Sequence, residues 1–349
     1  MLGGKLIGAE RASTIASPLW LVERLLRRFY LVLVAVASVA IVANEMSRSG
    51  TVLDDWDWLL VTGFGTWLAA VYFSLLLPDK LTQTLTRLVN RGVLNGDVDL
   101  AEFLAILHRR ARRSALLWSV AFAAAILVGW VVAFRHQLGG HALIVTLETM
   151  AAVPAGLFAG RAISYGLLAR RLAEAGFTVT PDPDHLDGAA GLRPIGALYF
   201  YQSGLLVIPG AFLAVWWLLI PFLGDRYLHW RDPYAGFLLI IVVSEVLAFV
   251  LPMLSFRRLM LRRKNELFHE ADELSRLSVR PEHDDTVKES RVKRYTAIES
   301  MPTWPVDVKI RRRFGLRNAL LVAPALAQLL GASQATQNLI ESLQKALSS

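Results

Sequence analysis

The sequence predicts an all-α, polytopic integral membrane protein with six transmembrane helices and a helical cytoplasmic extension. The 349 residues are 54% hydrophobic and only 19% charged, and the mean hydropathy is +0.44. This composition is unlike that of a soluble protein. Several apolar runs approach the roughly 20 residues that a helix needs to cross a bilayer. Lys and Arg residues also gather between alternate runs, as they do in membrane proteins with a fixed orientation.

Six apolar runs, flanked by charged residues or by Trp and Tyr, define the expected spans. They cover residues 29–43, 58–77, 114–134, 142–168, 198–222 and 234–256. A seventh run, residues 318–330, is too short to cross the membrane and contains Pro324. We therefore expect a packed, interfacial or re-entrant segment there.

The cations orient these spans, because Lys and Arg in short loops stay on the cytoplasmic side. Most of the 37 Lys and Arg residues fall before residue 29, in the loops 78–113 and 169–197, or after residue 256. The opposite loops contain only Arg48, Arg135, Arg226 and Arg231. We therefore expect cytoplasmic termini at both ends and a location in the bacterial inner membrane. Residues 3–17 have no apolar core, so no cleavable signal is expected.

Three regions follow from this topology: residues 1–28 as a cytoplasmic amphipathic segment, 29–256 as the transmembrane domain, and 257–349 as a cytoplasmic helical region. In loop 78–113 we expect an amphipathic helix, a turn at Asn95 and Gly96, and a second helix that begins at Asp99 and continues into the third span. The acidic stretch 182–188 lacks the spacing of a calcium loop and is expected to be a capped turn. After the last span the helix should project about six turns, and residues 280–299 should form a loop.

Several functional classes are excluded by what the sequence lacks. The absence of Cys excludes a disulfide scaffold, a cysteine-ligated zinc site and a thiol enzyme. No nucleotide-binding loop, metalloprotease motif or nucleophile elbow is present. We therefore expect neither enzymatic activity nor a cofactor or metal. Nucleic-acid binding is not expected either, because the cations follow the inner membrane face.

A basic cluster precedes the seventh apolar run. Each cation beside an anionic membrane contributes about 1 kcal/mol of attraction. The cluster is therefore expected to face lipid and to contact anionic headgroups. It contains Lys309, Arg311, Arg312, Arg313 and Arg317.

Three charged residues lie within the expected spans, where each costs at least about 2.5 kcal/mol at a helix centre. Glu245 is at the middle of the last span, whereas Glu148 and Arg161 are nearer the edges of the fourth. The partner of Glu245 must come from another helix, another subunit or water. An ion pair between Arg161 and Glu245 is within geometric reach and would indicate a structural or gating latch.

Small residues and helix breakers give two further expectations. Gly156 and Gly160, four residues apart, predict close packing of the fourth span against a neighbour. Gly63 and Gly65 in the second span, with Pro209 and Gly210 in the fifth, would interrupt two helices at equivalent places. Paired interruptions of this kind are found in transporters that bind substrate at the membrane midplane.

Three functional hypotheses remain. The first is an oligomeric ion or proton channel whose path includes Glu245 and Glu148, gated through the projecting helix by a soluble cytoplasmic partner. The second is a secondary transporter with a site between the broken helices. The third is a non-conducting scaffold or sensor, in which the three charges hold helices together.

Overall fold

A computed structural model of the chain describes residues 58–133, 142–222, 231–277 and 285–330, together with Val32, Val36 and Leu228. The first expected span lies outside the described residues apart from those two valines. The elements, in chain order, are α3 (Trp58–Leu75), α4 (Leu77–Asn90), β1 (Leu94–Asn95), α5 (Leu100–Ala133), α6 (Ala142–Gly166), α7 (Leu168–Glu174), β2 (Thr178–Val179), α8 (Arg193–Leu219), η3 (Ile220–Phe222), α9 (Arg231–Leu277), α10 (Asp285–Ser300) and α11 (Val308–Leu330).

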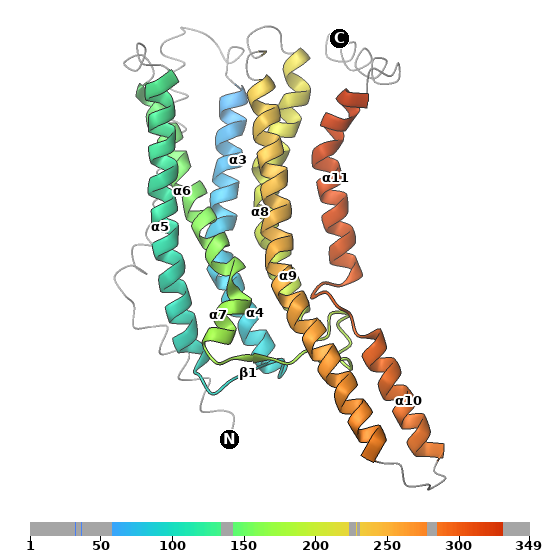
Figure 1. Ribbon diagram of the computed structural model, residues 1–349. Coiled ribbons are helices and arrows are strands. Elements are labelled where there is room, and N and C mark those ends of the chain that lie inside the picture. The colour runs from blue at the N-terminus through green and yellow to red at the C-terminus, as the bar shows by residue number, and fades with distance from the viewer. Residues whose placement is uncertain are drawn as a thin grey trace.

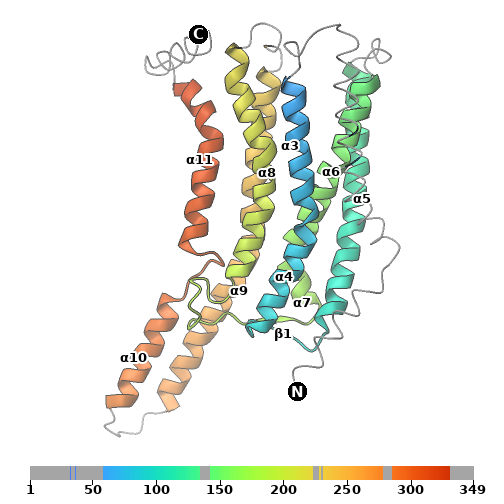
Figure 2. The ribbon, with the colours of Figure 1, turned by 180° about the vertical axis from the view of Figure 1, so that it is seen from behind.

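The long helices stand side by side in a bundle, and the lower part of α9 leaves it to form an arm with α10 (Figures 1 and 2). Three helices in the described residues are long and apolar enough to cross a membrane: Leu100–Val132, Arg193–Phe222 and Tyr234–Glu273. The bent pair Ala152–Gly166 and Leu168–Glu174 makes a fourth if it counts as one span. The helical class is confirmed, and the apolar helices indicate a membrane protein.

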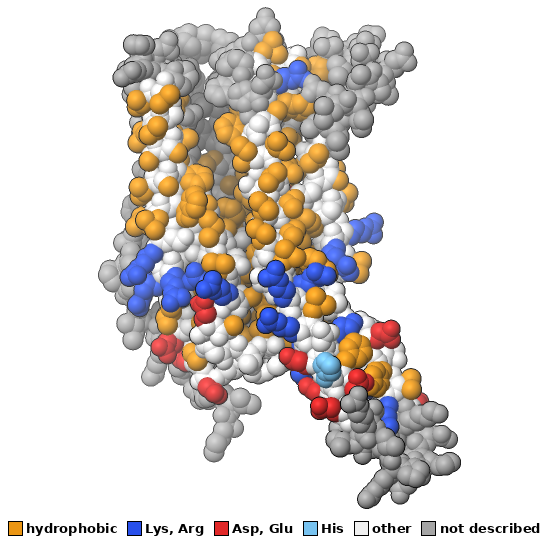
Figure 3. Space-filling model, in the orientation of Figure 1, with side chains coloured by type: hydrophobic (Ala, Val, Ile, Leu, Met, Phe, Trp, Pro, Cys, Tyr) orange, Lys and Arg blue, Asp and Glu red, His pale blue; other side chains and the backbone are white. Residues whose placement is uncertain are grey.

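The outer surface of the bundle has the layered charge distribution of a membrane protein. Figure 3 shows a broad hydrophobic surface that ends below in a row of Lys and Arg side chains, with Asp and Glu lower still. Leu117 and Val132 of α5 are 71% and 76% exposed, although the helix around them is apolar. Exposure of such side chains along a whole helix face is expected where lipid covers them.

The main core lies at the lower end of the bundle. Leu77, Leu81, Leu85 and Leu88 recur on one face of α4 and are fully buried. They belong to the same cluster as residues of α7, α8 and α9. Beside this core, β1 and β2 pair antiparallel, Leu94 opposite Val179, and join the two loops of the lower end. Below the membrane-facing surface the chain thus has a packed base.

Helices α5 and α6 approach each other more closely than ordinary side chains permit. A Cβ atom on Gly156 would lie 2.4 Å from the Cα of Ser119, and one on Gly160 would lie 2.5 Å from the Cα of Ala115. Ser119 Oγ also donates to the carbonyl of Val153 at 2.9 Å. The close packing expected from the glycine pair is confirmed.

The expected interruptions of the second and fifth spans are wrong. Helix α3 runs unbroken through Gly63 and Gly65, and α8 runs unbroken through Pro209 and Gly210. Gly63 allows a close contact instead, since a Cβ there would lie 3.3 Å from the Phe212 ring, whereas a Cβ on Gly65 would have no atom within 4 Å. A Pro is tolerated in a membrane helix where its neighbours compensate for the lost hydrogen bond. The real break in the bundle is the 52° bend between α6 and α7.

The arm shows one confirmed and one wrong expectation. Helix α9 continues to Leu277, as expected. We expected a loop over residues 280–299, but Asp285–Ser300 form α10. Polar contacts with α9, which an apolar sequence pattern does not indicate, help to hold this helix. Tyr295 hydrogen-bonds Asp272, and Lys264 Nζ donates to the carbonyl of Glu299 at 2.6 Å.

The seventh apolar run is part of α11, a helix of 23 residues that begins ten residues earlier than the run itself. It stands alongside α8 and α9, and its C-terminal end lies at the end of the bundle away from the arm (Figures 1 and 2). A helix of this length extends about 34 Å, close to the thickness of a bilayer core. Of the three expectations for residues 318–330, a packed, an interfacial or a re-entrant segment, the structure shows a helix packed against the bundle (Figure 1).

Candidate functional site

Glu245 is the most deeply buried charged residue of the described chain, with 0% of its surface exposed. Its position about a third of the way along α9, in the part that lies beside α8, keeps the carboxylate within the bundle (Figure 1). Arg317 of α11 pairs with it, Nη2 to Oε1 at 2.5 Å. Asn318 Nδ2 donates to the same oxygen at 3.3 Å. The last long helix thus supplies the partner that the sequence requires from elsewhere.

Arg317 is held in place by α8 as well as by Glu245. Its Nη2 donates to Ser203 Oγ at 2.7 Å, and its Nη1 donates to the Phe200 carbonyl at 3.3 Å. The guanidinium also lies over the Phe200 ring, 4.5 Å from the centroid. A planar guanidinium can make such contacts together, which an ammonium cannot. The arginine therefore joins three helices at one point.

Glycines on α8 make room for α11 at this point. A Cβ on Gly204 would lie 2.8 Å from Arg317 Nη1. Further along, a Cβ on Gly210 would lie 3.2 Å from Ile241 and 3.5 Å from Leu321. Beside the ion pair, the rings of Phe249 and Phe314 stack with centroids 4.3 Å apart. The contact between α11 and the bundle is therefore close and specific.

The hydrogen bonding at this site is incomplete. In the described structure, three buried atoms there have no hydrogen-bond partner: Glu245 Oε2, Arg317 Nε and Asn318 Oδ1. Each unsatisfied buried polar atom costs about 1 to 3 kcal/mol. Native proteins keep such atoms where they bind water or an ion, or where strain serves function. The incomplete cluster makes this contact the candidate functional site.

Of the other two charged residues of the expected spans, the structure describes the side chain of Arg161 alone, and it does not join Glu245. Arg161 is buried on α6, but the described ion-pair partner of Glu245 is Arg317, so the expected Arg161 to Glu245 pair is wrong. The reason is that α11, whose apolar run we expected to be too short to cross the membrane, occupies the place beside α9 (Figure 1). Glu148 is on α6, and its side chain lies outside the described residues.

The basic cluster divides into two parts. Lys309, Arg311, Arg312 and Arg313 are exposed at the start of α11, as expected of a cluster beside lipid headgroups. The lipid-facing expectation is wrong for Arg317, whose side chain is only 16% exposed. One helical turn beyond Arg313, it turns toward the bundle because a buried carboxylate attracts it there.

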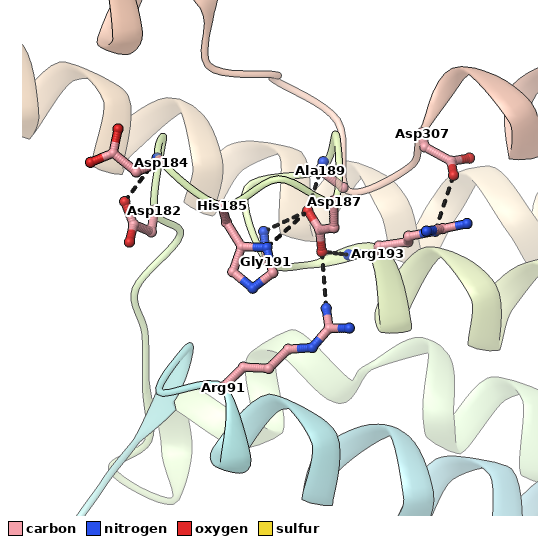
Figure 4. A network of polar contacts seen from close by, with 9 residues as sticks. All are labelled: Arg91, Asp182, Asp184, His185, Asp187, Ala189, Gly191, Arg193 and Asp307. Carbon is pink, nitrogen blue, oxygen red and sulfur yellow. Dashed lines mark hydrogen bonds and ion pairs between the residues drawn. The ribbon is translucent and has the colours of Figure 1, made fainter. Parts of the chain in front are cut away.

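The acidic loop before α8 is a structural network and confirms the expected capped turn. Asp187 Oδ1 accepts hydrogen bonds from the backbone N–H groups of Ala189 and Gly191, both at 2.9 Å, and Oδ2 pairs with Arg91 at 3.1 Å (Figure 4). A carboxylate so occupied is not available to a cation. No group of three or more potential metal ligands occurs in the part of the chain that the structure describes.

The same network anchors the lower end of α11. Asp307 pairs with Arg193 Nε at 3.1 Å (Figure 4) and accepts a hydrogen bond from the backbone N–H of Ile310 at 2.7 Å. The second bond caps the helix. Just before it, Arg257 lies over the ring of Trp304, 5.3 Å from the centroid. Helix α11 is therefore fixed at its base and held again, higher up, by Arg317.

Sequence reasoning missed Ser203, Gly204 and Asn318 and assigned Arg317 to the wrong surroundings. A usable signal was present: Arg317 and Asn318 directly precede an apolar run, and Glu245 lacks a partner on its own helix. Ser203 and Gly204 carry no such signal, because small polar and glycine residues are common in membrane helices.

The fold and the site together define a helical membrane protein whose last long helix is joined to the bundle by a buried ion pair. No protein-family model, no curated protein and no solved structure matches the chain.

Proposed function

We propose that the protein is a gated ion or proton channel in which α11 is the gate and the Glu245 to Arg317 pair holds it closed. The observation that carries the proposal is the incomplete polar cluster inside an apolar bundle. A purely structural ion pair gains most when every hydrogen bond is made, and this cluster leaves three buried atoms without a partner among the described residues.

The pairing itself supports a closed state. A carboxylate bound to a guanidinium is neutralised and does not attract a passing cation. Separating a buried pair costs about 3 to 5 kcal/mol, so an activating signal must favour the open arrangement by a similar amount. The arm of α9 and α10 continues directly from the helix that carries Glu245 and offers a route for such a signal from a soluble partner.

Liposome flux tests this proposal. The purified protein is compared with Arg317→Gln, Glu245→Gln and the double variant, using proton-sensitive and cation-sensitive dyes. We expect Arg317→Gln to raise the resting flux, because α11 loses its attachment. The double variant should conduct less than Arg317→Gln, because the carboxylate on the path is gone.

Two matched controls remove charge without touching the site. Arg313→Gln lies one turn away on the exposed side of α11, and Glu273→Gln is exposed on the arm. Both should behave as the wild type. Flux that is equal in the wild type and all five variants, with thermal stability lowered only by changes at the pair, would contradict the channel and favour the scaffold or sensor.

The secondary transporter stays a weaker alternative. Its sequence support was the pair of broken helices, and α3 and α8 are continuous. A flux that saturates with the concentration of one solute would distinguish it from a channel.

For location, we propose the bacterial inner membrane with the basic lower end of the bundle in the cytoplasm. Six spans and a homo-oligomer stay proposals, and so does contact of the basic start of α11 with anionic headgroups. A cytoplasmic C-terminal region disagrees with the direction of α11, whose end lies away from the arm (Figure 1). We propose instead that α11 lies within the membrane as a further helix.

A further inference from the structure

A second group of cations, distinct from the gate, lies where the bend between α6 and α7 meets α5. Arg171 of α7 is within electrostatic reach of Arg110 on α5 and of its neighbour Arg170. Like charges repel each other at such a place unless an anion lies between or beside them. The carboxylate within reach, that of Glu174, is already bonded to Arg170 Nε at 2.7 Å. The cluster therefore has an excess of positive charge.

Arg171 also has an unused donor. Its Nη1 atom is buried and has no hydrogen-bond partner among the described residues. A buried guanidinium N–H without an acceptor costs more than a neutral one, and an oxyanion would satisfy it. Arg110 is exposed, so a ligand can approach from the surface.

Exposed apolar side chains lie within eight residues of these cations along the chain. On α5, Leu116 and Leu117 are 64% and 71% exposed. Ile163, near the end of α6, and Leu167, between α6 and α7, are 48% and 47% exposed. Figure 3 shows the row of Lys and Arg side chains at the lower border of the hydrophobic surface. A ligand that matches both the cations and the exposed apolar side chains has an anionic phosphate group joined to hydrocarbon chains.

We propose that Arg110 and Arg171 bind the phosphate of an anionic phospholipid, whose acyl chains lie against the exposed faces of α5 and α6. This is a discrete site, separate from the exposed basic start of α11, and it does not depend on the channel proposal. Bound lipid would stabilise the 52° bend between α6 and α7 by satisfying the charge that the bend brings toward α5.

Thermal unfolding of the purified full chain in neutral detergent tests the site. Phosphatidylglycerol, phosphatidylcholine and inorganic phosphate are each titrated. We expect phosphatidylglycerol to raise the Tm and phosphatidylcholine to raise it much less. Arg171→Gln and Arg110→Gln should each need about tenfold more phosphatidylglycerol for half of the rise, which corresponds to one charge-assisted contact.

The matched control is Arg258→Gln, which removes an exposed arginine of α9 and should respond as the wild type. An equal weakening in this control would show unspecific charge attraction and overturn the site. A full Tm rise with inorganic phosphate alone would overturn the lipid assignment. If Arg171→Gln does not fold, Arg110→Gln alone still tests the site, because the side chain of Arg110 is exposed and its replacement should not disturb folding.

Discussion

At the scale of single residues, Glu245 determines much of what surrounds it. A carboxylate with no exposed surface needs a cation, and the cation must be long enough to reach it and able to bond its other neighbours. Arg317 meets both needs, since it bonds Glu245, Ser203 and the Phe200 carbonyl while it lies over an aromatic ring. An ammonium would satisfy the charge but not the planar contacts.

A double-mutant cycle measures this pair. Glu245→Gln or Arg317→Gln alone leaves one buried charge without its partner, so each should lower the free energy of unfolding by about 3 to 5 kcal/mol. The double variant leaves two amides that can bond each other and should lose clearly less than the sum. Chemical unfolding in mixed micelles gives the three values. Additive losses would mean that the two side chains do not interact in the folded protein.

At the scale of helices, α5 and α6 pack backbone against backbone. Two glycines allow backbone atoms to meet, and membrane helices gain stability mainly from such close packing, because lipid is as apolar as their side chains. Gly129, on the same α5, has no atom within 4 Å of the place where its Cβ would lie. The chain thus offers a contact glycine and a free glycine to compare.

We expect Gly160→Ala to destabilise the protein and Gly129→Ala to leave it unchanged or slightly more stable. The first forces a methyl group to within 2.5 Å of the Ala115 Cα, which costs about 1 to 3 kcal/mol when the helices must separate. The second adds helix propensity worth at most about 1 kcal/mol. Tm values of the two variants decide. Equal values would mean that α5 and α6 are not in contact at Gly160.

The helices also show which parts of the fold can be predicted from the sequence. Long apolar runs, together with the amphipathic spacing of α4, predict the helices from α3 to α9. Side chains that face lipid or the core at the lower end of the bundle must be apolar, and this requirement is visible in the sequence. Helix α10 could not be predicted in this way, because its sequence is mostly polar and few residues hold it: the two polar contacts with α9, the buried Ile298 and the ring of Tyr295 against Phe268. The candidate site was half predictable: Glu245 is conspicuous in its span, but its partner lies far along the chain, and only the packing of α11 brings them together.

At the scale of the whole molecule, the charged row below the hydrophobic surface predicts which end faces the cytoplasm. Leu186, in the lower loop, is fully exposed, and Leu228, between α8 and α9, is 44% exposed. The chain contains no Cys, so a single introduced thiol can be followed without background.

In intact spheroplasts, Leu228→Cys should react with a membrane-impermeant maleimide, and Leu186→Cys should react only after the membrane is opened. The positive-inside arrangement of the cations is the reason. A permeant maleimide, which should label both, controls for thiol accessibility. The reverse labelling pattern would show that the protein has the opposite orientation in the membrane, with the arm on the outer side.

The position of Arg317 near the end of the chain has a consequence for biosynthesis. Glu245 is made about seventy residues earlier, and ribosomes add roughly 5 to 20 residues per second, so the carboxylate waits several seconds for its counter-ion. During that time the nascent bundle contains a charge that its finished neighbours do not neutralise. The insertion machinery therefore has to keep the helix that carries Glu245 in contact with water or with the machinery until α11 is made. A chain truncated before α11 would keep an unpaired buried carboxylate and would be degraded by quality-control proteases.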